Sequence, residues 1–171
     1  EVIPYLDEID PSAQRVGAVY TVVKTASGLK GYNTDIIGFH KSLKKELGDH
    51  KMEGAMVLGT GGASRAVLDV LKYQLHLENI LFVSRSSRRE MLGLPVITYD
   101  QLHQIDGYYW DLVINTTPLG TYPQVDAYPA IPYERMKERA FTLAFDLVYN
   151  PPVTAFMKHA SAQGALTQNG M

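Results

Sequence analysis

The sequence contains no cysteine, so disulfides and thiolate metal sites are excluded, and its five histidines show no ligand spacing that predicts a metal. No apolar run reaches the length of about 20 residues that a membrane helix needs, and no signal peptide is recognisable. Neither sign of charge dominates, because 16 Lys and Arg residues stand against 18 Asp and Glu residues, a net charge of -2. These absences favour a cytoplasmic protein without a nucleic-acid or membrane partner.

The remaining composition is that of an ordinary globular protein. The 171 residues are 46% hydrophobic and 20% charged, which is enough for one domain with a core, or for one domain and part of another. The first residue is Glu1 rather than methionine, and the sequence stops abruptly after Asn169-Gly170-Met171. We therefore expect a fragment of a longer protein.

A glycine-rich stretch organises the sequence. The apolar run 55–58 precedes these glycines, and a helical pattern follows over 62–76. Strand, tight turn and helix in this order are typical of a dinucleotide-binding loop, where backbone N–H groups and the helix dipole attract a phosphate. Ser64 stands in the place of the third glycine of that motif. We predict cofactor contacts from Gly59, Thr60, Gly61, Gly62 and Ala63.

Two alternatives for the same stretch stay open, a nucleophile elbow and a structural turn. A third, the P-loop, is excluded because no lysine follows the glycines. A hydrolase nucleophile elbow would use Ser64, with Asp146 and His159 following in the hydrolase order, although the last glycine of G-x-S-x-G is absent. A turn of purely structural importance is the other alternative.

The end of the next apolar run, 80–84, bears on the choice of cofactor. NAD-binding proteins usually place a carboxylate there for the ribose hydroxyls. Here the run is followed by three arginines, with no acid at the position where one is needed, and a guanidinium suits a 2′-phosphate by charge and by its forked geometry. We predict NADP rather than NAD, with contacts from Ser84, Arg85, Ser86 and Arg89. The alternative is a solvated basic loop.

Apolar runs and helical patterns alternate from residue 55 onward. This alternation predicts an α/β fold with a doubly wound parallel sheet, a Rossmann-like domain. Residues 1–34 instead predict two short helices and a hairpin, so we place a domain boundary at residue 35, where a long helix begins. We expect strands at 55–58, 80–84, 96–98, 112–115, 143–148 and 165–167, and helices at 62–76, 87–91, 99–105, 132–139 and 154–163.

Several polar residues follow the predicted strands, where ligands of this fold bind. Thr116 and Thr117 belong to a loop that either faces the nicotinamide half of the cofactor or is a simple Pro-Gly turn. Tyr149 points its hydroxyl into the cleft or covers the core. Asp35 caps the long helix or presents its carboxylate to an interdomain cleft.

Seven motifs in order resemble one family, the shikimate dehydrogenases, and they cover essentially all of the chain. The motifs are Gly-Ala-Val-Tyr-Thr (17–21), Gly-Tyr-Asn-Thr-Asp-x-x-Gly-Phe (31–39), Gly-Thr-Gly-Gly-Ala-Ser-Arg-Ala (59–66), Ser-Arg-Ser (84–86), Asn-Thr-Thr-Pro-Leu-Gly (115–120), Asp-x-x-Tyr-Asn-Pro (146–151) and Gly-Ala-Leu-Thr-x-Asn-Gly (164–170).

The resemblance implies an enzyme that interconverts 3-dehydroshikimate and shikimate with NADPH, in the pathway to aromatic amino acids. It implies that residues 1–34 are a remnant of an α/β substrate domain and that 35–171 are the NADP domain. Asp35 matches the aspartate of the family's catalytic Lys–Asp pair. Thr34 and Tyr149 match substrate positions, and Leu147 and Gly170 match positions near the nicotinamide. Residues 59–63 match the pyrophosphate loop. The adenosine-phosphate site is matched by Ser84, Arg85, Ser86 and Arg89.

The sequence departs from the family at one substrate position, where Tyr20 replaces an asparagine. The family's catalytic lysine and further substrate motifs would fall outside the 171 residues, so we expect this chain alone to bind NADP(H) without turning over shikimate. A quinate/shikimate dehydrogenase and a non-catalytic NADP-binding paralogue stay open as alternatives. An exposed half-cleft could also drive association into a homodimer.

Overall fold

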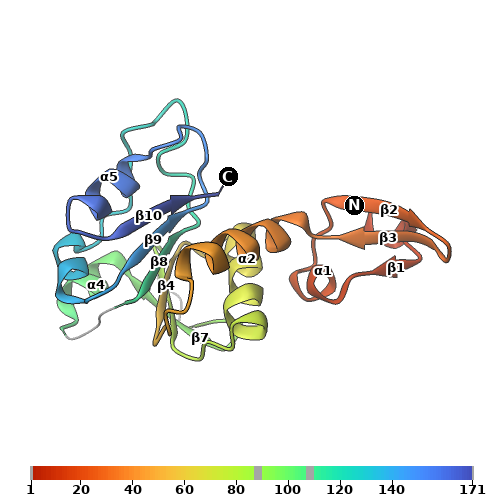
Figure 1. The fold of residues 1–171 in the computed structure, drawn as a ribbon, viewed down its shortest axis with the longest axis horizontal. Coiled ribbons are helices and arrows are strands. Elements are labelled where there is room, and N and C mark those ends of the chain that lie inside the picture. The colour runs from red at the N-terminus through yellow and green to blue at the C-terminus, as the bar shows by residue number, and fades with distance from the viewer. Residues whose placement is uncertain (1, 87–89, 107–109, 171) are drawn as a thin grey trace.

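Two β-sheets organise the molecule (Figure 1). The computed structural model describes residues 2–86, 90–106 and 110–170. Residues 2–33 form an arm with a three-stranded sheet of order β1-β3-β2. Helix α2 (Thr34–Leu47) leads from the arm to the larger sheet. The arm contains η1 (Ile3–Tyr5), β1 (Glu8–Ile9), α1 (Pro11–Val16), β2 (Thr21–Thr25) and β3 (Gly28–Tyr32).

The larger sheet has seven strands in the order β10-β9-β8-β4-β5-β7-β6. All pairs are parallel except β6 with β7, so the predicted doubly wound α/β sheet is confirmed. Its strands are β4 (Ala55–Leu58), β5 (Ile80–Ser84), β6 (Glu90–Met91), β7 (Leu94–Thr98), β8 (Leu112–Asn115), β9 (Leu143–Asp146) and β10 (Leu166–Asn169), and its helices are α3 (Gly62–Asp69), the π-helix η2 (Val70–Gln74), α4 (Tyr99–Gln104), the 3-10 helix η3 (Tyr133–Glu138) and α5 (Ala155–Ser161).

Apolar side chains cover both faces of this sheet. On one face Val57 and Ile114 belong to a cluster that includes residues of α2 and α3. On the other face Met56 and Val113 belong to a cluster with residues of η3 and α5. Because both faces are buried, the central strands are continuous apolar runs rather than alternating ones.

The arm packs directly against the larger unit. Asp10 caps α1 by accepting from the backbone N–H of Ser12 at 3.0 Å, and Val16 at the end of α1 belongs to the main core cluster. The Arg15 Nη2 donates to Oδ2 of Asp69 at 3.2 Å, and that carboxylate is 2% exposed. A buried carboxylate needs such a partner, so this contact fixes the arm on α3.

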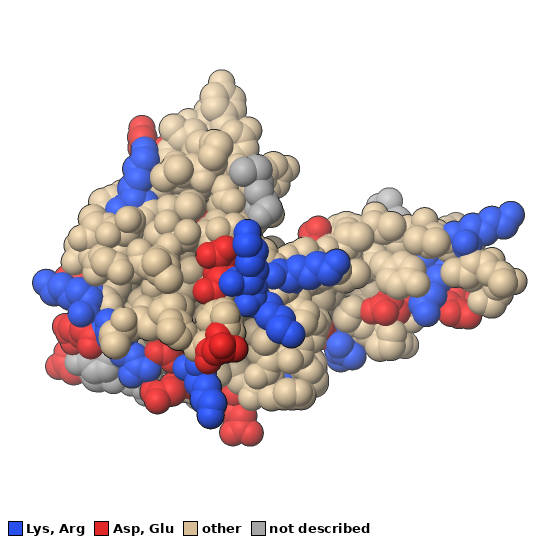
Figure 2. Space-filling view, in the orientation of Figure 1, with Lys and Arg blue, Asp and Glu red and all other residues tan. Residues whose placement is uncertain are grey.

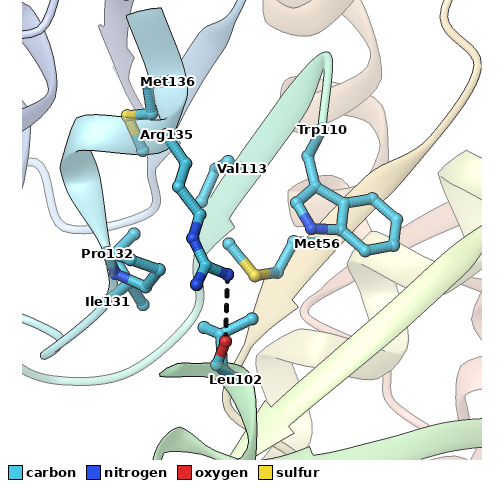
Figure 3. Close-up of a pocket in the computed structure, with 8 residues that line it drawn as sticks. All are labelled: Met56, Leu102, Trp110, Val113, Ile131, Pro132, Arg135 and Met136. Carbon is cyan, nitrogen blue, oxygen red and sulfur yellow. Dashed lines mark hydrogen bonds between the residues drawn. The ribbon is translucent and has the colours of Figure 1, made fainter. Parts of the chain in front are cut away.

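Arg135 connects η3 to the end of α4. Figure 3 shows it among the residues that line a pocket, with its hydrogen bond to Leu102. Its Nη1 donates to the backbone carbonyls of Leu102 at 3.1 Å and Ile105 at 2.6 Å, and its Nη2 donates to that of His103 at 3.2 Å. The last carbonyls of a helix have no partner within the helix. The guanidinium therefore serves as a C-terminal cap for α4.

We expect Arg135→Met to lower the free energy of unfolding by about 1 to 2 kcal/mol, because the stem still packs but the carbonyls lose their donors. Urea denaturation of the 171-residue chain measures this change. Lys137→Met on the same 3-10 helix is the matched control, because Lys137 is exposed and its replacement should cost less than about 0.5 kcal/mol. Equal losses in both variants would contradict the capping role.

Three element predictions need correction. The helix expected at 87–91 is wrong where the structure describes it, because Glu90 and Met91 form a strand; residues 87–89 lie outside the described residues. Met91 is buried in the core while Glu90 is exposed, which is strand alternation. The predicted strand 143–148 ends at Asp146, because the Val148 N–H donates to the Asp146 carboxylate at 3.0 Å instead of to a neighbouring strand. The third correction is an omission: strand β1, between the two short helices, was not predicted, because its two residues are too few to show a period.

Charged side chains of both signs lie next to one another on the face drawn in Figure 2, without separation into large areas of one sign. In the ranges that the structure describes, no helix is long and apolar enough to cross a membrane.

Candidate functional site

The order of the larger sheet reverses between β4 and β8. From β4 the chain continues to β5 and β7 on one side, and then to β8, β9 and β10 on the other. In register, Leu58 pairs with Asn115, and Asn115 pairs with Asp146. The loops that follow β4, β8 and β9 therefore lie together at one edge, here called the carboxyl rim, where ligands bind in this architecture.

Gly59 makes the sharp turn at the end of β4. Its φ is +104°, and a Cβ built on it would lie 2.8 Å from Oγ1 of Thr116 and 3.1 Å from Cγ2 of Thr117. Its N–H donates to the carbonyl of Val83 at 2.8 Å, which fixes the turn against β5. Only glycine adopts this backbone without strain or collision.

Gly61 has a different reason to be glycine. Its φ is -84°, and no atom lies within 4 Å of the position that a Cβ would take. Gly61 precedes the first residue of α3, and no side chain caps that helix end. The first N–H groups of α3 therefore have no side-chain cap, and the space beside Gly61 is open. This open backbone cradle fits an anion such as a pyrophosphate.

The end of β5 lies beside this cradle. The hydroxyls of Thr60 and Ser84 are 3.4 Å apart, and the Ser84 hydroxyl accepts from the Ser86 N–H at 3.3 Å. Burial raises the pKa of Tyr99, and the positive charge of Arg85 nearby opposes this shift. Arg85 is exposed and forms no ion pair with any described residue, so its guanidinium is available to an anion. The predicted contact from Arg89 lies outside the described residues.

Two neighbouring grooves open at the rim. The first, the rim groove, has a volume of about 520 Å³, and the second, the α2 groove, has about 430 Å³. Ala63, Leu147 and Tyr149 line both grooves and so form their common wall. The rim groove adds Gly62, Thr116, Thr117, Pro118, Thr121, Tyr122, Val148 and Asn150; the α2 groove adds Thr34, Asp35, Gly38, Phe39, Ser42, Ala66, Val67, Phe145 and Gly170.

The grooves bring together about half of the predicted site residues. The others include Gly59, Thr60, Gly61, Ser84, Arg85 and Ser86, which line neither groove. Thr34 and Asp35 from the arm side meet Tyr149, Leu147 and Gly170 from the far end of the chain. Tyr20 is 63% exposed and lines neither groove.

Asp35 is not the cap of α2, so that interpretation is wrong. Asn33 is the N-cap: its Oδ1 accepts from the N–H of Ile36 at 3.2 Å, while its Nδ2 donates to the carbonyl of Ala18 at 3.2 Å. Thr34 already has helical geometry, which places Asp35 inside the first turn. The exposed Asp35 carboxylate is therefore free to face the α2 groove.

The loop after β8 is more than a Pro-Gly turn. Oδ1 of the buried Asn115 accepts from the Thr117 N–H at 3.0 Å and from its hydroxyl at 2.6 Å. The Thr116 hydroxyl donates to the carbonyl of Leu58 at 2.7 Å. These bonds fix both threonines next to the glycine turn.

The sequence analysis did not single out Asn115 and Asp146 as a pair. The Asn115 Nδ2 donates to Oδ1 of Asp146 at 2.9 Å, and both residues are fully buried. Burial raises the pKa of Asp146 from 3.8 to about 6, although three hydrogen bonds favour its charged form. One signal was available: each is the last, polar residue of an otherwise apolar strand.

The nucleophile-elbow reading is wrong. The Ser64 hydroxyl is buried and donates to the carbonyl of Gly61 at 2.6 Å. The His159 ring stacks on the ring of Tyr128 at 4.0 Å, while Asp146 bonds to Asn115 and Thr154. The three groups do not form a relay.

The reversed strand order, the open space at Gly61 and the grooves at the rim define a Rossmann-type fold with a candidate nucleotide site. Comparison with known proteins narrows this description, because the chain is similar to shikimate dehydrogenases over nearly its whole length. It is 39% identical, over 99% of its length, to the protein of Halothermothrix orenii named shikimate dehydrogenase (NADP(+)). No family model matches. The chain spans about 63% of the length of the curated relatives.

Solved structures support the same placement. A chorismate mutase/shikimate 5-dehydrogenase fusion protein from Clostridium acetobutylicum has a TM-score of 0.82 and 38% identity, covering 99% of this chain and 61% of that one. Shikimate 5-dehydrogenase from Thermus thermophilus, solved in complex with NADP(H) and shikimate, has a TM-score of 0.78 and 34% identity, covering 99% and 62%.

Proposed function

We propose that the chain binds NADP(H) at the carboxyl rim, as part of an oxidoreductase that interconverts 3-dehydroshikimate and shikimate. The observation that carries the proposal is the open backbone cradle at Gly61, beside the obligatory glycine turn at Gly59. The names of the relatives support the choice of ligand, because curated relatives carry NADP in their name and one solved relative contains NADP(H) and shikimate.

In this proposal each wall of the rim has a part in holding the cofactor. The pyrophosphate lies against residues 59–63, where helix α3 presents its N–H groups. Ser84, Arg85 and Ser86, with Arg89, bind the adenosine phosphate, since a guanidinium matches a dianionic phosphate. Thr116, Thr117, Leu147 and Gly170 face the nicotinamide half. The cofactor supplies hydride transfer, and the protein supplies binding and orientation.

The substrate is proposed to occupy the α2 groove. Asp35 would orient a substrate hydroxyl and a partner lysine through hydrogen bonds, with Thr34 and Tyr149 as further contacts. The common wall of Ala63, Leu147 and Tyr149 separates this groove from the rim groove, which would bring the two ligands next to each other. Residues 1–34 would then belong to a substrate domain and 35–171 to the NADP domain. A homodimer and a cytoplasmic location stay predictions.

A fluorescence titration of the 171-residue chain tests the cofactor. We expect saturable binding of NADPH that is at least about tenfold tighter than that of NADH, since each factor of ten corresponds to about 1.4 kcal/mol and one charge-assisted contact supplies that much. In Arg85→Gln the preference should fall several-fold. Lys51→Gln removes one positive charge near the other end of the strands, in a groove with Asp111 and Arg139, and should leave the preference unchanged. If neither nucleotide binds, the proposal is wrong.

A further inference from the structure

Asp146 is a buried carboxyl group directly beneath the rim. It is fully buried and lines neither groove, so it is not placed to touch a ligand. Its Oδ1 accepts from Nδ2 of Asn115 at 2.9 Å and from the N–H of Val148 at 3.0 Å. Its Oδ2 accepts from the hydroxyl of Thr154 at 2.6 Å.

Each of these three partners belongs to a different segment. Asn115 ends β8 and passes the connection on to the N–H and hydroxyl of Thr117. Val148 belongs to the loop after β9, which lines the rim groove. Thr154 is the N-cap of α5 and accepts from the N–H of Met157 at 3.3 Å. One carboxyl group thus connects both loops that form the walls of the rim groove to the helix behind them.

We propose that Asp146 is a positioning residue for cofactor binding: its carboxyl group fixes the loops after β8 and β9 so that Thr117 and Leu147 face the rim groove in one arrangement. The part that concerns the cofactor rests on the proposed function. The part that concerns the loops rests on the hydrogen bonds alone.

The surroundings of Asp146 indicate that its carboxyl group is present to accept hydrogen bonds. The other residues of β9, Leu143, Ala144 and Phe145, are apolar and buried, and a carboxyl group in such surroundings costs stability unless it is bonded. An apolar side chain at position 146 would satisfy the core, yet it would leave the Val148 N–H and the Asn115 amide without their acceptor. The buried carboxyl group is therefore better explained by the loops than by the core.

Asp111 offers a matched comparison at the other end of the sheet. It is also buried, at 6% exposure, and also accepts from backbone N–H groups, those of Glu53 at 2.5 Å and Gly54 at 3.3 Å. It pairs with Arg139 and lines no part of the rim groove. Loss of Asp111 should disturb stability without disturbing the rim.

The experiment measures amide hydrogen exchange and NADPH affinity on the full 171-residue chain. In Asp146→Ala, the N–H groups of Thr117 and Val148 should exchange at least about tenfold faster, since local opening sets their protection, and the NADPH dissociation constant should rise at least about tenfold. Asp146→Asn should restore both, because an amide oxygen can accept the two Oδ1 bonds and the amide nitrogen can donate to Thr154. Asp111→Ala should accelerate Glu53 and Gly54 instead and leave NADPH affinity unchanged.

A second variant keeps the proposal testable if Asp146→Ala does not fold. Asn115→Ala removes the connection to one loop only, so Thr117 should exchange faster while Val148 stays protected. Two results would overturn the positioning role. One is unchanged exchange of the Thr117 N–H in Asn115→Ala, and the other is equal acceleration of Thr117 and Val148 in Asp111→Ala. If the wild type binds no NADPH, the proposed function fails, and the exchange rates still decide whether Asp146 fixes the loops.

Discussion

Gly59→Ala is expected to lower the free energy of unfolding by about 2 to 4 kcal/mol, the sum of a left-handed backbone strain of about 1 to 2 kcal/mol and a steric collision of similar size. The φ of +104° accounts for the strain, and the contacts of 2.8 Å to Thr116 and 3.1 Å to Thr117 account for the collision. Neither threonine can withdraw freely, because the Thr116 hydroxyl is bonded to the Leu58 carbonyl and Thr117 is bonded to Asn115. Urea denaturation measures the loss.

Gly61→Ala is the matched control for this prediction. Its φ is ordinary and the space around its Cβ position is open, so its stability should change by less than about 1 kcal/mol, the usual difference between glycine and alanine. Its effect should appear in binding instead, since the added methyl group enters the cradle proposed for the pyrophosphate. Similar stability losses at both positions would contradict the distinct roles assigned to the two glycines.

The stability of the chain should also respond to the ionisation of Asp146. Burial raises its pKa from 3.8 to about 6, so the folded state favours the protonated form. The resulting stabilisation is complete below about pH 4 and is lost as the pH rises past about 6. A shift of about 2 units corresponds to about 3 kcal/mol. We therefore expect Asp146→Asn, which carries no charge, to gain about 3 kcal/mol on the wild type between pH 4 and pH 7.

The difference in unfolding free energy between Asp146→Asn and the wild type reports on the Asp146 carboxyl group alone. Glu8 and Asp10 have pKa values lowered by hydrogen bonds from Ser27 and Ser12, so their contributions run in the opposite direction and cancel in the comparison. The nearby Tyr133 has its pKa raised by burial and stays neutral throughout. Chemical denaturation at several pH values gives the result. A difference that does not change with pH would show that Asp146 does not titrate in this range.

Much of the architecture could be predicted because it depends on local patterns. The apolar runs of β4, β5 and β8 gave their bounds correctly, since strands buried on both faces differ plainly from helical periodicity. The two short helices expected in residues 1–34 are also present as η1 and α1, because a helix start such as Asp10-Pro11 involves only neighbouring residues. Where local signals were weak, as at the two-residue strands β1 and β6, the prediction failed.

The sequence by itself determined the α/β class, the glycine turn at Gly59 and the resemblance to the family, since each depends on short runs of neighbouring residues. The tertiary structure alone decided that Thr34 meets Tyr149 in one groove and that Asn115 bonds to Asp146. Both contacts join segments that are far apart in the sequence. Such contacts depend on which strands become neighbours and in what register, and no local periodicity carries that information.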